Sequence, residues 1–196
     1  MISYKKVLFA GILGLAVVVL FSWFLSAELT KGGGTVTVTA TVGEVACSVS
    51  ATSTAFGALN FGSVNSSSPD ILATMACAAV PSGCTLYVND AGSGANPGLW
   101  NSSATHLVTS TDATLSPGSE GYGIQATTSA GGWTINSKYN KSGNDIGGLT
   151  LSTTVYASST SGLSTSTATT THKTTISTST AAGSYTDTIT YSCTAN

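Results

Sequence analysis

The sequence predicts an all-β domain, an antiparallel β-sandwich, preceded by one apolar N-terminal helix. Residues 35–42 read TVTVTATV, and this alternation of polar and apolar residues is typical of a strand with one buried face. Turn-forming clusters then recur along the chain, at residues 65–69, 90–94, 116–118, 130–132 and 142–145. Many short strands separated by such clusters favour a sandwich.

Ten further stretches between these clusters have the composition of strands. They are residues 47–50, 56–61, 70–78, 84–89, 106–111, 121–128, 133–136, 149–157, 172–178 and 184–194. The last is the clearest, because Tyr185, Ile189 and Tyr191 share one face, which Asp187 interrupts near its start. Residues 158–171 consist largely of Ser and Thr, and we expect an exposed loop or a loosely held edge there.

The N-terminal segment predicts export. Lys5 and Lys6 precede an uncharged apolar run at residues 7–25, and positive charge stays on the cytoplasmic side of a membrane. The run is long for a signal peptide and short for a spanning helix, so residues 1–27 are expected to be either a cleaved signal peptide or a retained anchor. Residues 28–34 then form a Gly-rich linker, and residues 35–196 form the β-sandwich domain.

Composition supports an extracellular location and excludes nucleic acid as a partner. Charged residues make up 7 % of the chain, and there is no arginine. After residue 27 there are four Lys and eight acidic residues, a formal charge of −4, whereas nucleic-acid binding needs clustered cations. Ser and Thr supply 63 of the 196 residues, which gives the surface hydroxyl groups in place of charges.

The four cysteines, Cys47, Cys77, Cys84 and Cys193, predict two disulfides in an oxidising compartment. A hairpin turning at Val80 and Pro81 would set Cys77 opposite Cys84, which leaves Cys47 to pair with Cys193. The rival pairing joins Cys47 to Cys77 and Cys84 to Cys193. The spacing lacks the close C-x₂₋₄-C pairs of zinc sites, so no structural metal is expected.

No catalytic constellation is present in the sequence. The two histidines, His106 and His172, lie near no nucleophile motif and no second ligand at metal spacing, so we expect neither an enzyme nor a cofactor. Residues 90–96 carry oxygen ligands at alternating positions, as a calcium loop would, but lack the closing glutamate, which favours an ordinary turn. Trp100, expected in a loop, is the candidate exposed contact residue, although a loop Trp that caps the end of a sandwich is more frequent.

Two stretches carry a family resemblance. Residues 47–57 read CSVSATSTAFG and residues 182–191 read AGSYTDTITY. Both resemble the ends of the spore coat U / secreted pilin-like domain, which implies an Ig-like sandwich. The middle of the chain, from residues 120–125 through 139–141, is more similar to uncharacterised short single-anchor surface proteins of candidate-phylum bacteria. That second likeness covers most of the exported chain and implies no activity.

The expected function is a non-catalytic exported structural or adhesion protein of the cell surface or envelope. Its expected partners are other surface proteins, glycans or further copies of itself, and the membrane through residues 7–25 if these are retained. One alternative is a pilin-like fibre subunit, for which the resemblance implies that residues 35–42 of one copy complete the sheet of another. A second alternative is a secreted carbohydrate-binding module with an exposed Trp100 and a polar groove.

Overall fold

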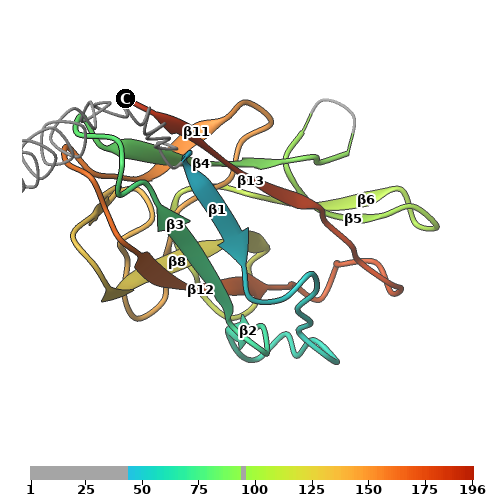
Figure 1. The fold of residues 1–196 in the computed structure, drawn as a ribbon. Coiled ribbons are helices and arrows are strands. Elements are labelled where there is room, and N and C mark those ends of the chain that lie inside the picture. Colours follow the sequence, from blue (N-terminus) through green and yellow to red (C-terminus); the bar gives the residue numbers. More distant parts are fainter. Residues whose placement is uncertain (1–43, 94–95) are drawn as a thin grey trace, which may run out of the picture. The chain divides into compact units, whose positions relative to one another are not determined.

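The computed structural model describes residues 44–93 and 96–196, and these residues form one compact unit (Figure 1). Its described residues are all-β, with antiparallel strand pairs and no helix, as the sequence predicts. The strands are β1 (Ala46–Val49), β2 (Asn65–Ser66), β3 (Ile71–Ala76), β4 (Cys84–Asp90), β5 (Gly98–Asn101), β6 (His106–Thr109), β7 (Ala113–Thr114), β8 (Gly121–Ala130), β9 (Thr134–Ile135), β10 (Asp145–Ile146), β11 (Thr154–Ser158), β12 (Ser166–Thr175) and β13 (Ile189–Ala195). The apolar run 7–25 and the alternating stretch 35–42 lie outside the described residues.

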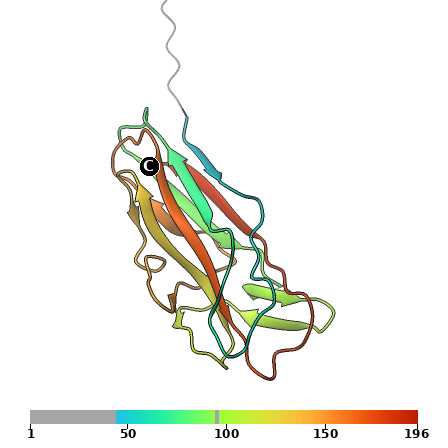
Figure 2. The same ribbon diagram turned by 90° about the horizontal axis from the view of Figure 1, so that it is seen from below.

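Two main sheets build the sandwich. The first has the order β1-β3-β12-β2, with β8 also paired to β12, and the second has the order β13-β4-β11-β9. The long strands β8 and β12 run side by side over nine residue pairs (Figure 2). Two short antiparallel pairs, β5 with β6 and β7 with β10, complete the described structure. Among the described residues, no helix is long and apolar enough to span a membrane.

Alternate side chains of the facing strands fill the space between the sheets. On β3, Ile71, Ala73 and Met75 are buried, and on β4, Leu86 and Val88 are buried. This period of two follows from the pleat of a strand, and full burial of such a side chain contributes about 1.5–3 kcal/mol. The inward alternation predicted for these strands therefore forms the core.

Strand β12 corrects the expectation for residues 158–171. Residues 166–171 belong to this strand, which pairs with both β3 and β8 and is therefore central instead of exposed. Two hydroxyls on its inward face are satisfied inside the core: Thr170 Oγ1 lies 2.6 Å from the Tyr156 hydroxyl, and Thr174 donates to Gly121 O, whereas the buried Ser166 Oγ has no hydrogen-bond partner among the described residues. Threonine suits a strand because it is β-branched, and these hydrogen bonds allow the polar groups to be buried.

The connection between β3 and β4 also differs from the expectation. These strands lie in different sheets, so residues 78–83 cross the end of the sandwich and do not form a hairpin. Two tight turns shape the crossing, with Val80 N donating to Cys77 O and Gly83 N donating to Val80 O. Cys77 and Cys84 are bonded across it, and their Cα atoms are 6.3 Å apart.

Two local predictions were wrong. Residues 56–61 form no strand, because after the single bridge from Ala55 to Ser68 the chain runs through irregular turns. Trp100 lies in strand β5 and not in a loop: its backbone N–H donates to Thr186 O and its carbonyl accepts from Thr186 N. In both cases, whether the residues form a strand depends on backbone pairing with residues distant in the sequence, which the local alternation of polar and apolar residues does not reveal.

The sandwich has one closed edge and one open edge. At the closed edge, residues 131–133 connect β8 to β9, and Gly131, at φ +104°, packs tightly against Ser166. At the other edge, β1 and β13 end their respective sheets, and among the described residues each pairs with one neighbour. The Cys47–Cys193 disulfide joins these two edge strands, with Cα atoms 6.1 Å apart.

Candidate functional site

A groove with a volume of about 990 Å³ occupies the open edge of the sandwich. Residues 49–59 form one side of it, and residues 180–187 with Ile189 and Tyr191 form the other. Figure 1 shows β1 and β13 diverging from the end at which the disulfide joins them. We call this feature the edge groove.

The groove exists because the first sheet loses its outer strand at this edge. Strand β1 ends at Val49, after which Ser50 N donates to Leu72 O and the chain leaves the sheet. The next residues are small and polar, and Gly57 adopts a left-handed φ of +68° that a strand would not accommodate. Beyond Val49 the first sheet therefore has no strand beside β13, although the side chains beneath this gap, Ile71, Leu99 and Tyr122, are only 2–5 % exposed.

The floor of the groove is mainly apolar and aromatic. Ile71, Leu99 and Tyr122 line it. Phe56, from the side formed by residues 49–59, packs edge to face against Tyr122 at a centroid distance of 6.3 Å. Ile189 and Tyr191 remain partly exposed, although they stand on the inward face of β13. An apolar floor bounded by an unpaired strand edge is the arrangement into which an additional β-strand can bind.

The disulfide closes the narrow end. A second, smaller hollow there is lined by Cys47, Ser48 and Val49 on one side and by Ile189, Thr190 and Tyr191 on the other. The bond between Cys47 and Cys193 lies just beyond it. A strand bound in the groove can therefore extend from the wide end to this bond and no farther.

His172 gives the wide end a polar floor. Its imidazole is 4 % exposed, stacks on the Tyr122 ring at a centroid distance of 6.5 Å, and leaves both ring nitrogens without a hydrogen-bond partner. Burial lowers its pKa from 6.5 to about 4, because the charged form would lose its hydration, and the nearby Asp70 carboxylate opposes this change. The imidazole is therefore neutral at pH 7.

Two carboxyl groups lie at the same end. Asp187 lines the groove, and Asp90, on the neighbouring strand, is 1 % exposed. Burial and the adjacent Asp187 raise the pKa of Asp90 to about 8, and burial also raises the pKa of Asp187. A buried like-charge pair of this kind cannot ionise fully at neutral pH.

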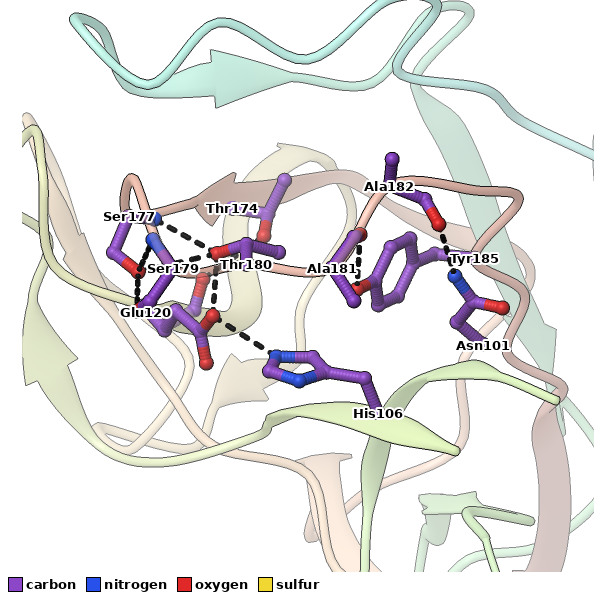
Figure 3. A network of polar contacts seen from close by, with 11 residues as sticks. Asn101, His106, Glu120, Thr174, Ser177, Ser179, Thr180, Ala181, Ala182 and Tyr185 are labelled. Carbon is purple, nitrogen blue, oxygen red and sulfur yellow. Dashed lines mark hydrogen bonds and ion pairs between the residues drawn. The ribbon is translucent and has the colours of Figure 1, made fainter. Parts of the chain in front are cut away.

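A polar network holds the wall that precedes β13 (Figure 3). Glu120 accepts a hydrogen bond from Thr180 Oγ1, and its Oε1 lies 2.9 Å from His106 Nε2. Farther along the wall, the Tyr185 hydroxyl donates to Ala181 O, and Asn101 Nδ2 donates to Ala182 O. Thr180 is thereby held at the start of β8 and Ala182 at the end of β5, while the bond from Tyr185 to Ala181 braces the segment internally.

The residues singled out from the sequence are distributed over the domain. Trp100 is half-buried in β5, His106 belongs to the wall network, and His172 lies on the groove floor. In residues 90–96, Asp90 Oδ1 accepts the Gly92 N–H, and no cluster of three or more His, Cys, Asp or Glu side chains suited to a metal occurs in residues 44–93 and 96–196.

Sequence reasoning did not foresee the juxtaposition of Asp90 and Asp187. The signal was present, since Asp187 interrupts the apolar face of the last strand, but its partner lies 97 positions earlier in the chain. Only the pairing of β13 with β4 brings the two together.

Comparison with known proteins gave no match to a family model, to a curated protein or to a solved structure.

Proposed function

We propose that this chain is a non-catalytic exported surface protein whose copies assemble when residues 35–42 of one copy bind in the edge groove of another. The observation that carries this proposal is the groove itself, an apolar channel beside the unpaired edge of β13. Such an edge offers backbone N–H and C=O groups to an added strand, while the floor offers apolar contacts to every second side chain.

Residues 35–42 have the pattern that this groove requires. Val36, Val38, Ala40 and Val42 would face the floor, and the four intervening threonines would face solvent. The small, uncharged side chains suit a site bounded by aromatic rings. Added backbone hydrogen bonds would stabilise the complex along its length, and the alternating apolar residues would fix the register.

The occupant comes from a second copy because of where the segment joins the domain. Val42 is four residues from Ala46, the first residue of β1, at the disulfide end of the groove. To enter its own groove, the segment would have to pass the Cys47–Cys193 bond within those few residues. A segment from another copy enters at the wide end without meeting this obstacle, and repetition of the contact gives an open chain of subunits.

The other functions receive less support from the geometry. Simple adhesion without assembly leaves the open groove unexplained. A carbohydrate-binding module would present aromatic side chains to solvent, whereas Trp100 is half-buried and its strand is paired with Thr186. The groove has a polar wide end, but its floor is mainly apolar and fits a β-strand better than a sugar.

A pair of neighbouring substitutions tests the proposal. Val38→Asp places a carboxylate on the face directed at the floor, whereas Thr37→Asp places the same charge on the face directed at solvent. We expect exported full chains of the wild type and T37D to form oligomers, visible by size-exclusion chromatography and electron microscopy, and V38D to remain monomeric. Equal assembly of T37D and V38D, or monomers in all three chains, would contradict strand complementation.

A second experiment locates the binding site. The V38D chain keeps its own groove empty, so a synthetic peptide of residues 35–42 should bind to it, and the same peptide carrying V38D should not. The intact mass of the exported protein shows whether the N-terminal segment has been removed. A released subunit should have the mass of a chain that begins near Glu28. Hydrolysis of any glycan by the purified protein would refute a non-catalytic function.

A further inference from the structure

Asp90 is the last residue of β4, and Asp187 lies two residues before β13, the strand that pairs with β4. In the antiparallel pair of β13 and β4, Ile189 lies opposite Asp90. Asp187 precedes Ile189 by two residues, so it points to the same face and stands diagonally across from Asp90. Two acidic side chains thus meet at the point where the groove wall joins the second sheet.

No positive charge balances this pair in the described structure. The described ion pair joins His106 to Glu120, while Lys173 Nζ donates to Gly143 O and Lys138 lies over the Tyr139 ring. Neither Oδ2 of Asp90 nor Oδ2 of Asp187 accepts a hydrogen bond from an N–H or O–H group among the described residues. A proton held between the carboxyl groups would partner both oxygens.

The surroundings favour one charge and disfavour two. The backbone N–H groups of Gly92 and Gly98 donate to Asp90, and Thr188 N donates to Asp187 Oδ1, which stabilises a carboxylate. The other titratable group that faces the pair is the Tyr122 hydroxyl on β8, which donates toward the Asp187 carboxylate and favours its charged form. The neutral His172 of β12 is stacked behind Tyr122. None of these supplies a cation at neutral pH.

We propose that Asp90 and Asp187 share one proton, and that this proton holds the wall of the edge groove against β4. When it is lost at alkaline pH, two buried carboxylates repel each other across the strand pair, and residues 184–188 detach from the sheet. The second negative charge of the ionised pair also faces the apolar side chains of a strand bound in the groove. Assembly therefore weakens as the pH rises, a consequence that rests on the proposed function, whereas the release of the wall does not.

The pH dependence of the wall can be measured without assembly in the monomeric V38D chain. We expect hydrogen exchange of residues 184–189, corrected for the intrinsic effect of pH, to rise about tenfold between pH 6 and pH 9, since each pH unit above a pKa changes the population tenfold. Asp187→Asn keeps the shape of the side chain and removes one charge, so it should remove most of this rise. Glu44→Gln, at an exposed acid outside the groove, is the matched control and should behave as V38D alone.

The same measurements contain the outcomes that would overturn the proposal. An exchange rate independent of pH, or an equal rise with and without D187N, would show that the pair does not hold the wall. Protection at pH 9 by calcium but not by sodium would replace the shared proton with a bound cation. Assembly of the chain with intact Val38 is then compared at pH 6 and pH 9. If hydrogen exchange in the wall depends on pH but the chain assembles at neither pH, the proposed function is refuted and the proton-sharing pair is not.

Discussion

Cys47 and Cys193 join the two strands that border the edge groove. One cysteine is on the edge strand of the first sheet, the other is on the edge strand of the second, and 146 residues separate them in sequence. The bond therefore closes almost the entire domain into one loop. It also sets the narrow limit of the groove, so one covalent link serves both the stability of the domain and the shape of the site.

Removing this bond should destabilise the domain more than removing Cys77–Cys84, whose sequence separation is 7. Chain entropy credits the long loop with about 5 kcal/mol and the short loop with about 2 kcal/mol. We expect urea unfolding of the C47S/C193S variant to show the larger loss in free energy, with C77S/C84S as the matched control. Equal losses would mean that native packing, and not loop closure, decides the contribution of each bond.

The hydrogen bond between Tyr156 and Thr170 links the two sheets through the core. Tyr156 stands on β11 of the second sheet, Thr170 stands on β12 of the first, and their oxygens are 2.6 Å apart in a buried setting. Thr170→Val leaves the Tyr156 hydroxyl without this partner and should cost about 1–3 kcal/mol, because a buried polar group keeps its desolvation penalty.

A double-mutant cycle separates this hydrogen bond from packing. The double variant Y156F/T170V, which removes both hydroxyls, should be more stable than the sum of the single losses predicts. Additive losses in urea unfolding would indicate that the two groups do not interact.

Glu120 should control the mobility of the groove wall more than the stability of the domain. Glu120 and His106 are about one quarter exposed, and ion pairs of this kind contribute about 0.2–1 kcal/mol. Glu120→Gln weakens the contacts to both Thr180 and His106. We expect hydrogen exchange to rise in residues 177–185 with little change in the urea midpoint. Asp112→Asn, which affects a carboxylate bound to Gly148 N on another loop, should leave that segment unchanged.

The sequence predicted the class of fold because its signal is local. Alternation along β3 and the turn clusters around it are enough to indicate short strands with one buried face. The same reasoning failed for residues 166–171, where the buried face is built from Ser and Thr and looks like surface. It also failed for the step from Cys77 to Cys84, because a tight turn does not reveal whether the next strand joins the same sheet or the opposite one.

The candidate site was less accessible to sequence reasoning than the fold. Residues 35–42 could be chosen as an unusual strand from their alternation, but the groove depends on where β1 stops. That end is set by contacts with β3, a strand more than 20 residues away. The acid pair depends on a register between two strands that are distant in sequence, which no local pattern encodes.

The buried His172 predicts a loss of stability in acid. Its pKa is lowered from 6.5 to about 4 by burial, so the neutral form stabilises the folded state above pH 6.5, and this contribution disappears as the pH falls toward 4. A difference of this size corresponds to about 3 kcal/mol. The raised pKa of Asp90 has the opposite sign, because its contribution is present at low pH and is lost as the pH rises toward 8.

Comparison of variants separates these two opposing effects. His172→Phe keeps a ring stacked on Tyr122 and removes the titrating nitrogens, so its unfolding free energy should fall less than that of the wild type between pH 6.5 and pH 4. His106→Gln, which replaces the other described histidine, is the matched control and measures how much of the slope arises outside the core. Parallel curves for the wild type and H172F in urea unfolding would show that His172 gains a partner or hydration on protonation, which is incompatible with a buried imidazole that has none.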